Sequence, residues 1–368
     1  MIRLLILNLG FVLIQATFRT AVFSQSKSSL WPHNIFSPYC DLSLTPTFNI
    51  NWAQKQTGNA VYTLSFITAD ASGTPSWGGR YAASTQFYMK EISTLRSKGG
   101  DVIVSFGGFV GPELALSILD PIQLQKAYQM VIDTYSLSYI DFDIEGTAVV
   151  DVASNTRRAQ ALSALQAANP GLKVSFTFPV TPTGLDQNCL NALSILNQAG
   201  VVVDVVNIMA MDYQYVQPVG SMSMGQYAIN AAISTNDQIH SLGIQATIGV
   251  TPMIGQNDIA NEIFQISDAQ QLVEFAQGTS WVTFLGYWSL NRDTSVQGPL
   301  YMSSQINQNT FDFLTVFQNY TAVYDAGPSG NLSLPQQPES ERTSESIRNF
   351  HSVFISLFLS LISLLSFV

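Results

Sequence analysis

Charged residues are scarce in this chain of 368 residues, of which they make up only 11%. Within that small total, 25 acidic residues outnumber 15 basic ones, so the formal net charge at pH 7 is −10. A surface of that sign repels a phosphate backbone, which makes nucleic acid a poor partner.

Cysteine and histidine are also rare. Cys40 and Cys189 are too few for a disulfide framework, and the three histidines, His33, His240 and His351, lack the spacing of a metal site. This scarcity argues against a zinc hydrolase and against a serine–histidine hydrolase. We therefore expect an activity that uses no metal and no cofactor.

The amino-terminal residues predict secretion. A basic head, Met1–Arg3, precedes the apolar run Leu4–Ala16, and small residues at Val22–Ser24 offer a cleavage site. Residues 1–24 are therefore interpreted as a signal peptide, and the mature chain is expected to begin near Gln25.

The other end of the chain predicts attachment to a membrane. Residues 353–368 are almost wholly apolar and follow a polar segment that contains Ser344, which is the order of a glycosylphosphatidylinositol (GPI) anchor signal. Residues 327–346 are rich in proline and serine and predict a flexible stalk, and residues 347–368 the anchor signal. A single tail-anchoring helix is the alternative. Either interpretation places the protein outside the cell, at its surface, and the glycosylation sequons at Asn319 and Asn331 agree with passage through the secretory pathway.

Between these ends, short β-rich runs alternate with longer stretches of helical pattern, as in consecutive βα units. One helix is expected at Ser154–Ala168, where Leu162 and Leu165 share a face. Eight such units favour a closed (β/α)₈ barrel over an open doubly wound sheet, and they predict one catalytic domain over residues 25–326, acting as a monomer. The eight predicted strands are Ile35–Leu42, Ala60–Thr68, Val102–Gly108, Tyr139–Gly146, Lys173–Val180, Val201–Tyr213, Ile244–Gly255 and Val282–Ser289.

The fourth predicted strand carries three acids at alternate positions, Asp141, Asp143 and Glu145. Alternation places them on one face, while Ile140 and Phe142 lie on the other and meet the helices. Three acids stacked inside a barrel retain at least one proton, because full ionisation there is costly. The outermost acid, Glu145, could donate that proton to a leaving oxygen, which is the chemistry of a glycosidase.

These residues resemble a known family. Ile140–Glu145 is similar to the second half of the D-G-x-D-x-D-x-E signature of family 18 glycoside hydrolases, the chitinases, and Ser105–Gly108 is similar to their S-x-G-G motif. The resemblance covers nearly all of Phe36–Asp293 and is to a bacterial-type branch. Its other segments are Asn207–Tyr213, Val250–Asp258 and Tyr287–Asp293.

The resemblance implies roles for the individual acids. Glu145 matches the general acid/base, Asp143 the residue that holds the substrate's N-acetyl group, and Asp141 its buried partner. It also implies that the substrate is chitin or an N-acetylglucosamine oligosaccharide whose own acetamide is the nucleophile, so that the anomeric configuration is retained.

The resemblance assigns further residues to substrate binding. Ser105 would orient Asp141, and Gly107 and Gly108 would leave room for a sugar ring. Trp288 matches an aromatic floor on which a pyranose ring could stack.

Two departures from the family pattern stand out. Ser138 and Tyr139 replace the aspartate and glycine that open the long signature. In the sixth predicted strand the family's M-x-Y-D would place tyrosine at position 211, where this chain has Met211. Asp212 keeps its place, and a bulge in the strand could let the Tyr213 hydroxyl hold the acetamide instead.

Three functions remain open from the sequence. The first is an endo-acting chitinase, and the second an endo-N-acetylglucosaminidase that acts on glycoproteins. The third is a non-hydrolytic chitin-binding lectin on the same barrel, although Glu145 and both aspartates, which such relatives lose in part, are present. The barrel order also predicts that Cys40 and Cys189 lie too far apart to form a disulfide.

Overall fold

The computed structural model describes residues 31–213 and 222–325. The predicted signal peptide, stalk and anchor signal lie outside these residues and stay predictions. None of the described helices is both long and apolar enough to cross a membrane.

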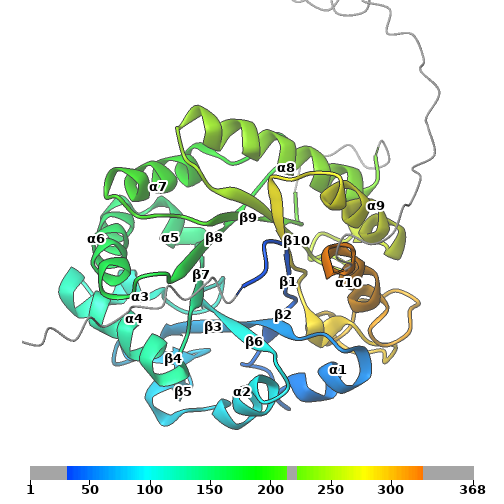
Figure 1. Ribbon diagram of the computed structural model, residues 1–368, viewed down its shortest axis with the longest axis horizontal. Coiled ribbons are helices and arrows are strands. Elements are labelled where there is room, and N and C mark those ends of the chain that lie inside the picture. The colour runs from blue at the N-terminus through cyan, green and yellow to red at the C-terminus, as the bar shows by residue number, and fades with distance from the viewer. Residues whose placement is uncertain (1–30, 214–221, 326–368) are drawn as a thin grey trace, which may run out of the picture. The chain divides into compact units, whose positions relative to one another are not determined.

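All eight predicted strand regions contain a parallel strand, and in Figure 1 these strands form the centre of the fold. The observed strands are shorter than predicted at several ends; Val202, for example, precedes its strand and is 65% exposed. The first region is split into β1 (Ile35–Phe36) and β2 (Tyr39–Asp41). The others are β3 (Val61–Ala69), β6 (Asp101–Gly107), β7 (Tyr139–Asp143), β8 (Lys173–Pro179), β9 (Val205–Ala210), β10 (Thr247–Pro252) and β13 (Val282–Leu285).

The split first strand closes the sheet into a barrel. On one side β1 pairs in parallel with β13, where Ile35 lies opposite Phe284. On the other side β2 pairs in parallel with β3, where Tyr39 lies opposite Thr63. The remaining strands follow in chain order around the ring. The prediction of a closed barrel is therefore confirmed, and the open sheet is excluded.

Helices surround the barrel, as Figure 1 shows. Local sequence fixes their ends: Asp120 caps α4 by accepting from the amide of Gln123, and Pro121 occupies the first helical position. The predicted helix at Ser154–Ala168 is present, with Leu162 and Leu165 buried. The helices are α1 (Ile50–Thr57), α2 (Met89–Arg96), α3 (Leu114–Ser117), α4 (Pro121–Tyr135), α5 (Gly146–Val150), α6 (Val152–Ala168), α7 (Gln187–Gln198), α8 (Met224–Ser241), α9 (Ile266–Gln277) and α10 (Asp312–Asp325).

Short elements on the connecting loops were not predicted. Two short strands are added to the sheet beside β3, the first antiparallel to β3 and the second antiparallel to the first. A small two-stranded hairpin follows β10. Each is too short to show the alternation by which strands are found in a sequence. They are β4 (Pro75–Trp77), β5 (Tyr81–Ala82), β11 (Gly255–Gln256) and β12 (Ile263–Phe264), with 3₁₀ turns η1 (Ala83–Thr85), η3 (Leu290–Arg292) and η4 (Leu300–Met302).

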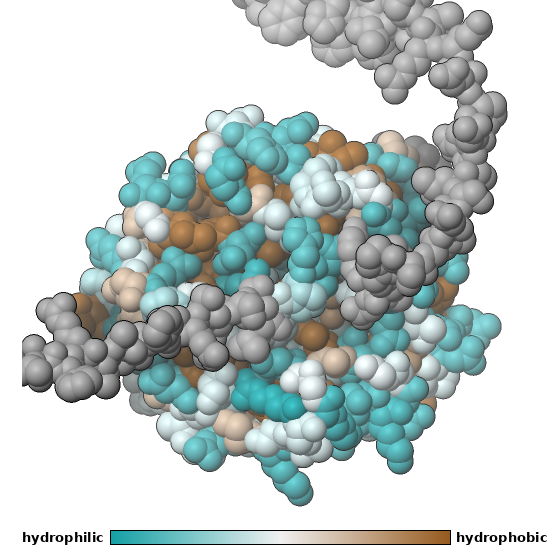
Figure 2. Space-filling view, in the orientation of Figure 1, coloured by the Kyte–Doolittle hydropathy of each residue, from teal (hydrophilic) through white to brown (hydrophobic). Residues whose placement is uncertain are grey.

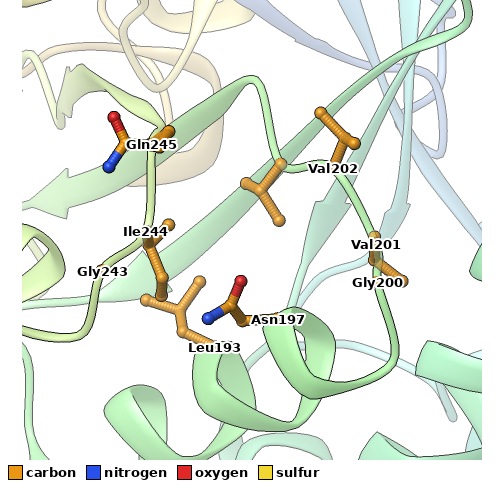
Figure 3. Close-up of a pocket in the computed structure, with 9 residues that line it drawn as sticks. Leu193, Asn197, Gly200, Val201, Val202, Gly243, Ile244 and Gln245 are labelled. Atoms are coloured by element: carbon orange, nitrogen blue, oxygen red, sulfur yellow. The ribbon is translucent and has the colours of Figure 1, made fainter.

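A pocket of about 230 Å³, shown in Figure 3, opens at the amino ends of β9 and β10. It lies between α7 and the residues that lead into the two strands, with Leu193 and Ile244 in its wall. Because barrel active sites lie at the carboxyl ends of the strands, this pocket is at the wrong end for the predicted chemistry.

On the face of the molecule shown in Figure 2, apolar residues form separate patches among polar ones.

Both cysteines are buried and unpaired, which confirms the prediction that Cys40 and Cys189 form no disulfide. Cys40 lies in β2 and Cys189 in α7.

Candidate active site

The acids of the fourth strand region occupy the interior of the barrel. Asp141 and Asp143 in β7 are only 2% and 4% exposed, and Phe142 between them packs on the helix side. Glu145 follows the carboxyl end of β7, in extended backbone (φ −129°, ψ 168°) that continues the alternation, and is partly exposed. The three acids therefore form a ladder toward the open end of the barrel, as predicted.

Both carboxylate oxygens of the lowest acid, Asp141, accept hydrogen bonds. Its Oδ2 accepts from Tyr39 Oη (3.0 Å) and Ser105 Oγ (2.7 Å), and its Oδ1 accepts from Ser175 Oγ (2.6 Å) and Thr177 Oγ1 (2.9 Å). Burial raises the pKa of Asp141, while these four bonds act against that rise because they favour the ionised form.

Ser105 thus contacts Asp141 as the resemblance implied, and it is completely buried. Sequence reasoning missed Tyr39, Ser175 and Thr177. A signal was present for the last two, because they alternate in β8 with the buried Phe176 and Phe178 and so face the interior.

The middle acid, Asp143, has the opposite environment. Its Oδ1 has no hydrogen-bond partner among the described residues. Burial, followed by the charges of Glu145 and Asp141, raises its pKa well above the ordinary value. An orphaned buried oxygen beside two other acids is costly, and such a cost marks a functional site.

The outermost acid, Glu145, has a pKa raised to about 7, chiefly by burial and then by the charge of Asp212. A carboxyl group with such a pKa is protonated in a substantial fraction of molecules at neutral pH. It can therefore both give and take a proton there, as a general acid/base must.

Asp212 follows the end of β9 with a left-handed φ of 47°. Its Oδ1 accepts from the amide of Ile259 (3.0 Å), and its own amide donates to Asn257 Oδ1 (3.3 Å). Burial raises the pKa of Asp212, and the charge of Arg292 acts against that rise. The loop after β10 therefore fixes Asp212 within electrostatic reach of Glu145.

The two sequence neighbours of Asp212, Met211 and Tyr213, have different surroundings. Met211 is partly exposed at the barrel mouth. Tyr213 is 2% exposed, its ring lies edge-on to Tyr227 of α8 at 6.1 Å, and its amide donates to Glu262. No acceptor in the described part of the chain lies within hydrogen-bond reach of the Tyr213 hydroxyl. Acetamide binding by Tyr213 stays a prediction.

Trp288 lies just beyond β13 and is partly exposed. It stacks on Phe66 of β3, with ring centroids 5.6 Å apart and planes 18° apart, and its centroid lies 6.3 Å from that of Tyr39. Since Tyr39 also bonds Asp141, Trp288 borders the same interior as the acids, where an aromatic floor was predicted.

The structure gives a packing reason for the two glycines, Gly107 and Gly108, that follow Ser105 in β6 and just beyond it. A Cβ at Gly107 would collide with the carbonyl oxygen of Asp143, and one at Gly108 would lie 2.6 Å from the ring of Phe66. Any side chain at either position would therefore collide with the protein itself, and the room that these glycines were expected to leave for a sugar ring stays a prediction. The glycines, both at positive φ, let β6 approach β7 closely, where the Gly108 amide donates to the carbonyl of Asp143 (2.9 Å).

Within residues 31–213 and 222–325, no group of three or more His, Cys, Asp or Glu side chains is arranged to hold a metal ion. A closed parallel barrel with a ladder of coupled acids at its mouth defines a class of protein, the barrel enzymes whose proton transfers are carried by carboxylic acids.

Comparison with known proteins narrows this class. No protein-family model matches the chain. It is 32% identical over 308 residues to a probable bifunctional chitinase/lysozyme of Escherichia coli (75% of this chain, 34% of that protein). It is also 32% identical over 279 residues to endochitinase 11 of Metarhizium anisopliae (72% of this chain, 53% of that protein). The chain thus spans about a third and about half of the lengths of these two relatives.

Among solved structures, it is similar to active domain 2 of a thermostable chitinase from Pyrococcus furiosus, a catalytic-site mutant complexed with chito-oligosaccharides. The identity is 32%, the TM-score is 0.71, and the match covers 80% of this chain and 96% of that one. The chain belongs to glycoside hydrolase family 18.

Proposed function

We propose that this chain is an endo-acting chitinase that cleaves β-1,4-linked N-acetylglucosamine polymers with Glu145 as the general acid/base. The observation that carries the proposal is the pairing of Glu145, whose pKa is about 7, with the buried and unsatisfied Asp143 beneath it. The relatives named as chitinases, and the chito-oligosaccharides bound to one of them, support the same substrate class.

The acids suit a mechanism in which the substrate provides the nucleophile. Asp141 and Asp143 lie in β7, below Glu145 and on the same face of the chain, so neither can reach the far face of a sugar bound above them. The 2-acetamido oxygen would then bond to the anomeric carbon while the glycosidic C–O bond breaks and Glu145 protonates the leaving oxygen. Asp143 would stabilise the positive charge on the acetamide nitrogen.

The second step restores the enzyme. Water attacks the anomeric carbon and gives its proton to Glu145, and the bond from the acetamide oxygen breaks. Displacement at the same carbon has then occurred twice, so the β-configuration is retained. Ser105, Tyr39, Ser175 and Thr177 take no part in these bonds and instead keep Asp141 fixed beneath Asp143.

Substrate choice tests this mechanism. Acetylated chitin oligomers should be cleaved, with the β-anomer as the first product seen by proton NMR. Cellohexaose, which lacks the acetamide, and fully deacetylated chitosan, which lacks its carbonyl, should be inert even where they bind. Comparable rates on cellohexaose, or first release of the α-anomer, would show that the acids serve other chemistry.

The same assay addresses the two alternatives. A lectin would bind the oligomers without cleaving them, which the presence of all three acids argues against. An endo-N-acetylglucosaminidase would leave chitin oligomers intact and cleave the chitobiose core of a glycoprotein glycan instead.

The proposed location is the cell surface, and it rests on the sequence of residues 1–24 and 347–368 alone. A phosphatidylinositol-specific phospholipase should release active enzyme from cells if the anchor is GPI. Detection of the peptide 353–368 in membrane-derived protein would favour the tail-anchoring helix.

A further inference from the structure

A second concave site lies on the rim of the barrel. It encloses about 300 Å³ between α1 and the long connection from β13 to α10. Its apolar wall includes the side chains of Phe48, Trp52, Leu290, Val296 and Met302. In a barrel the segments that follow the strands gather at the carboxyl ends, so this pocket opens on the same end of the molecule as Glu145.

The same segment of chain lines both the rim pocket and the catalytic mouth. Trp288 borders the acids, and Leu290, two residues later, is buried in the wall of the rim pocket. The side chain of Asn291 joins the pocket to the end of β2: its Oδ1 accepts from the amide of Asp41 (2.9 Å), and its Nδ2 donates to the carbonyl of Asp41 (3.1 Å).

A buried arginine holds the pocket in shape. Arg292 is 0% exposed and donates to three backbone carbonyls, those of Leu300 (2.8 Å), Trp288 (3.4 Å) and Gln256. Farther along the same connection, Gln305 donates to the carbonyl of Gly298 (2.6 Å). A site that is already ordered loses little entropy when it binds a ligand.

The chemistry of the wall selects a neutral, ring-shaped ligand. Trp52 is 45% exposed, and the rings of Phe311 (4.7 Å between centroids) and Phe48 (5.9 Å) pack against it at tilted angles of 51° and 56°. Gln297 adds an exposed amide at the edge. Among the described residues that line the pocket, the only charged side chain is Asp293, which is 1% exposed and accepts hydrogen bonds from Tyr287 and Gln308. Nothing there attracts a phosphate or an acidic peptide.

From these observations we propose that the rim pocket is a second sugar-binding site, which takes one pyranose ring of the same β-linked amino-sugar polymer outside the catalytic mouth. The ring would stack on the exposed part of the Trp52 indole, and Gln297 would form a hydrogen bond with a hydroxyl or acetamide group. Its volume lies at the lower end of the range for small-molecule pockets, which suits one ring better than a chain. This inference rests on the proposed function, because a polymer substrate is what gives a second site its use.

The test compares Trp52→Ala with the unchanged enzyme on two substrates. Trp52→Ala should weaken binding to insoluble chitin about tenfold, the effect of losing one stacked ring. The second substrate is a soluble aryl glycoside of N,N′-diacetylchitobiose, which is too short to reach the rim. The kcat/KM of Trp52→Ala on it should stay within about twofold of the original value, a change much smaller than the loss of a stacking contact would cause. Trp52→Phe should restore most of the chitin binding.

Two further variants guard against a folding effect. Val296→Asp changes a side chain that is 68% exposed and should weaken chitin binding in the same way, because it puts a charge into the apolar wall. Tyr81→Ala, which truncates another half-exposed aromatic residue (41%) in β5, should leave chitin binding unchanged. Unchanged chitin binding in both rim variants would overturn the proposal, and so would an equal loss on both substrates. Loss of self-association or of binding to lipid vesicles, with chitin binding intact, would assign the pocket to a different occupant.

Failure of the proposed function would look different. If the proposed function is wrong, the unchanged enzyme will cleave neither chitin nor the aryl glycoside. Chitin binding can be measured without any cleavage in the Glu145→Gln variant, with and without Trp52→Ala. Binding that depends on Trp52 there would support the rim site by itself.

Discussion

Glu113 and Asp143 are both buried carboxylates, 2% and 4% exposed, and both lie close to Gly107. Glu113 pairs with Arg158 (2.7 Å) and also accepts from Tyr128 Oη (2.9 Å) and the amide of Ala115 (2.8 Å). Asp143 instead lies between two other acids and has an oxygen without a donor in the described structure. Burial alone therefore does not distinguish a structural acid from a functional one; the charge of the surrounding groups does.

The largest effect is expected on the functional side of this comparison. Glu145→Gln removes the proton that the leaving oxygen needs, so turnover of chitin oligomers should fall by roughly 10²- to 10⁴-fold. Binding of the oligomers, measured by calorimetry, should survive because the shape of the side chain is kept. Near-normal turnover would remove Glu145 from its assigned role.

On the structural side, Glu113→Gln should cost stability. Without its anion, the Arg158 guanidinium stays buried and unpaired, and the free energy of unfolding should fall by about 3–5 kcal/mol. Urea unfolding at pH 7 measures this. The double variant Glu113→Gln, Arg158→Met should recover part of the loss, since no charge then remains buried. If the single variant is as stable as the original, the ion pair between Glu113 and Arg158 contributes little to the stability of the fold.

Asp143→Asn should change stability in the opposite direction. The pKa of Asp143 is raised in the folded protein, so ionisation of this residue destabilises the fold as the pH rises above the unfolded value and toward the folded one. The amide avoids that cost. We expect the variant to be more stable than the original at pH 8 and to differ little from it near pH 2, where the carboxyl is protonated in both the folded and the unfolded state. A gain that is independent of pH would point to packing instead.

The smallest expected effect is a shift of the pH profile. The charge of Asp212 helps to raise the pKa of Glu145 to about 7, so Asp212→Asn should lower that pKa. The proton donor would then be lost at lower pH, and the alkaline limb of kcat/KM should move down by up to about one pH unit. Asp258→Asn, on the exposed side of Asp212, is the matched control and should shift the limb less. An unmoved limb would separate Asp212 from Glu145.

Sequence patterns predicted the parts of the site that one strand can define. Alternation in the run from Tyr139 to Glu145 placed the three acids on the interior face, and the observed burial agrees. The pattern did not show the packing reason for Gly107 and Gly108: a Cβ at Gly107 has no room against β7, and one at Gly108 has none against Phe66 of β3. The role of Arg292 in holding the loops together was not predicted, since its partners are backbone carbonyls that lie 4, 8 and 36 residues away in the chain.

The sequence by itself thus determined which residues face inward, the order of the eight strands and the family, because a period of two and a chain of βα units are local properties. The tertiary structure alone decided which acids are stabilised. Asp141 receives its donors from β2, β6 and β8, while Asp143 finds no donor for Oδ1 in the described chain. Closure of the barrel brings distant hydroxyl groups to one carboxylate and leaves the next without a donor, and the free energy of a charge depends on those neighbours rather than on its place in the chain.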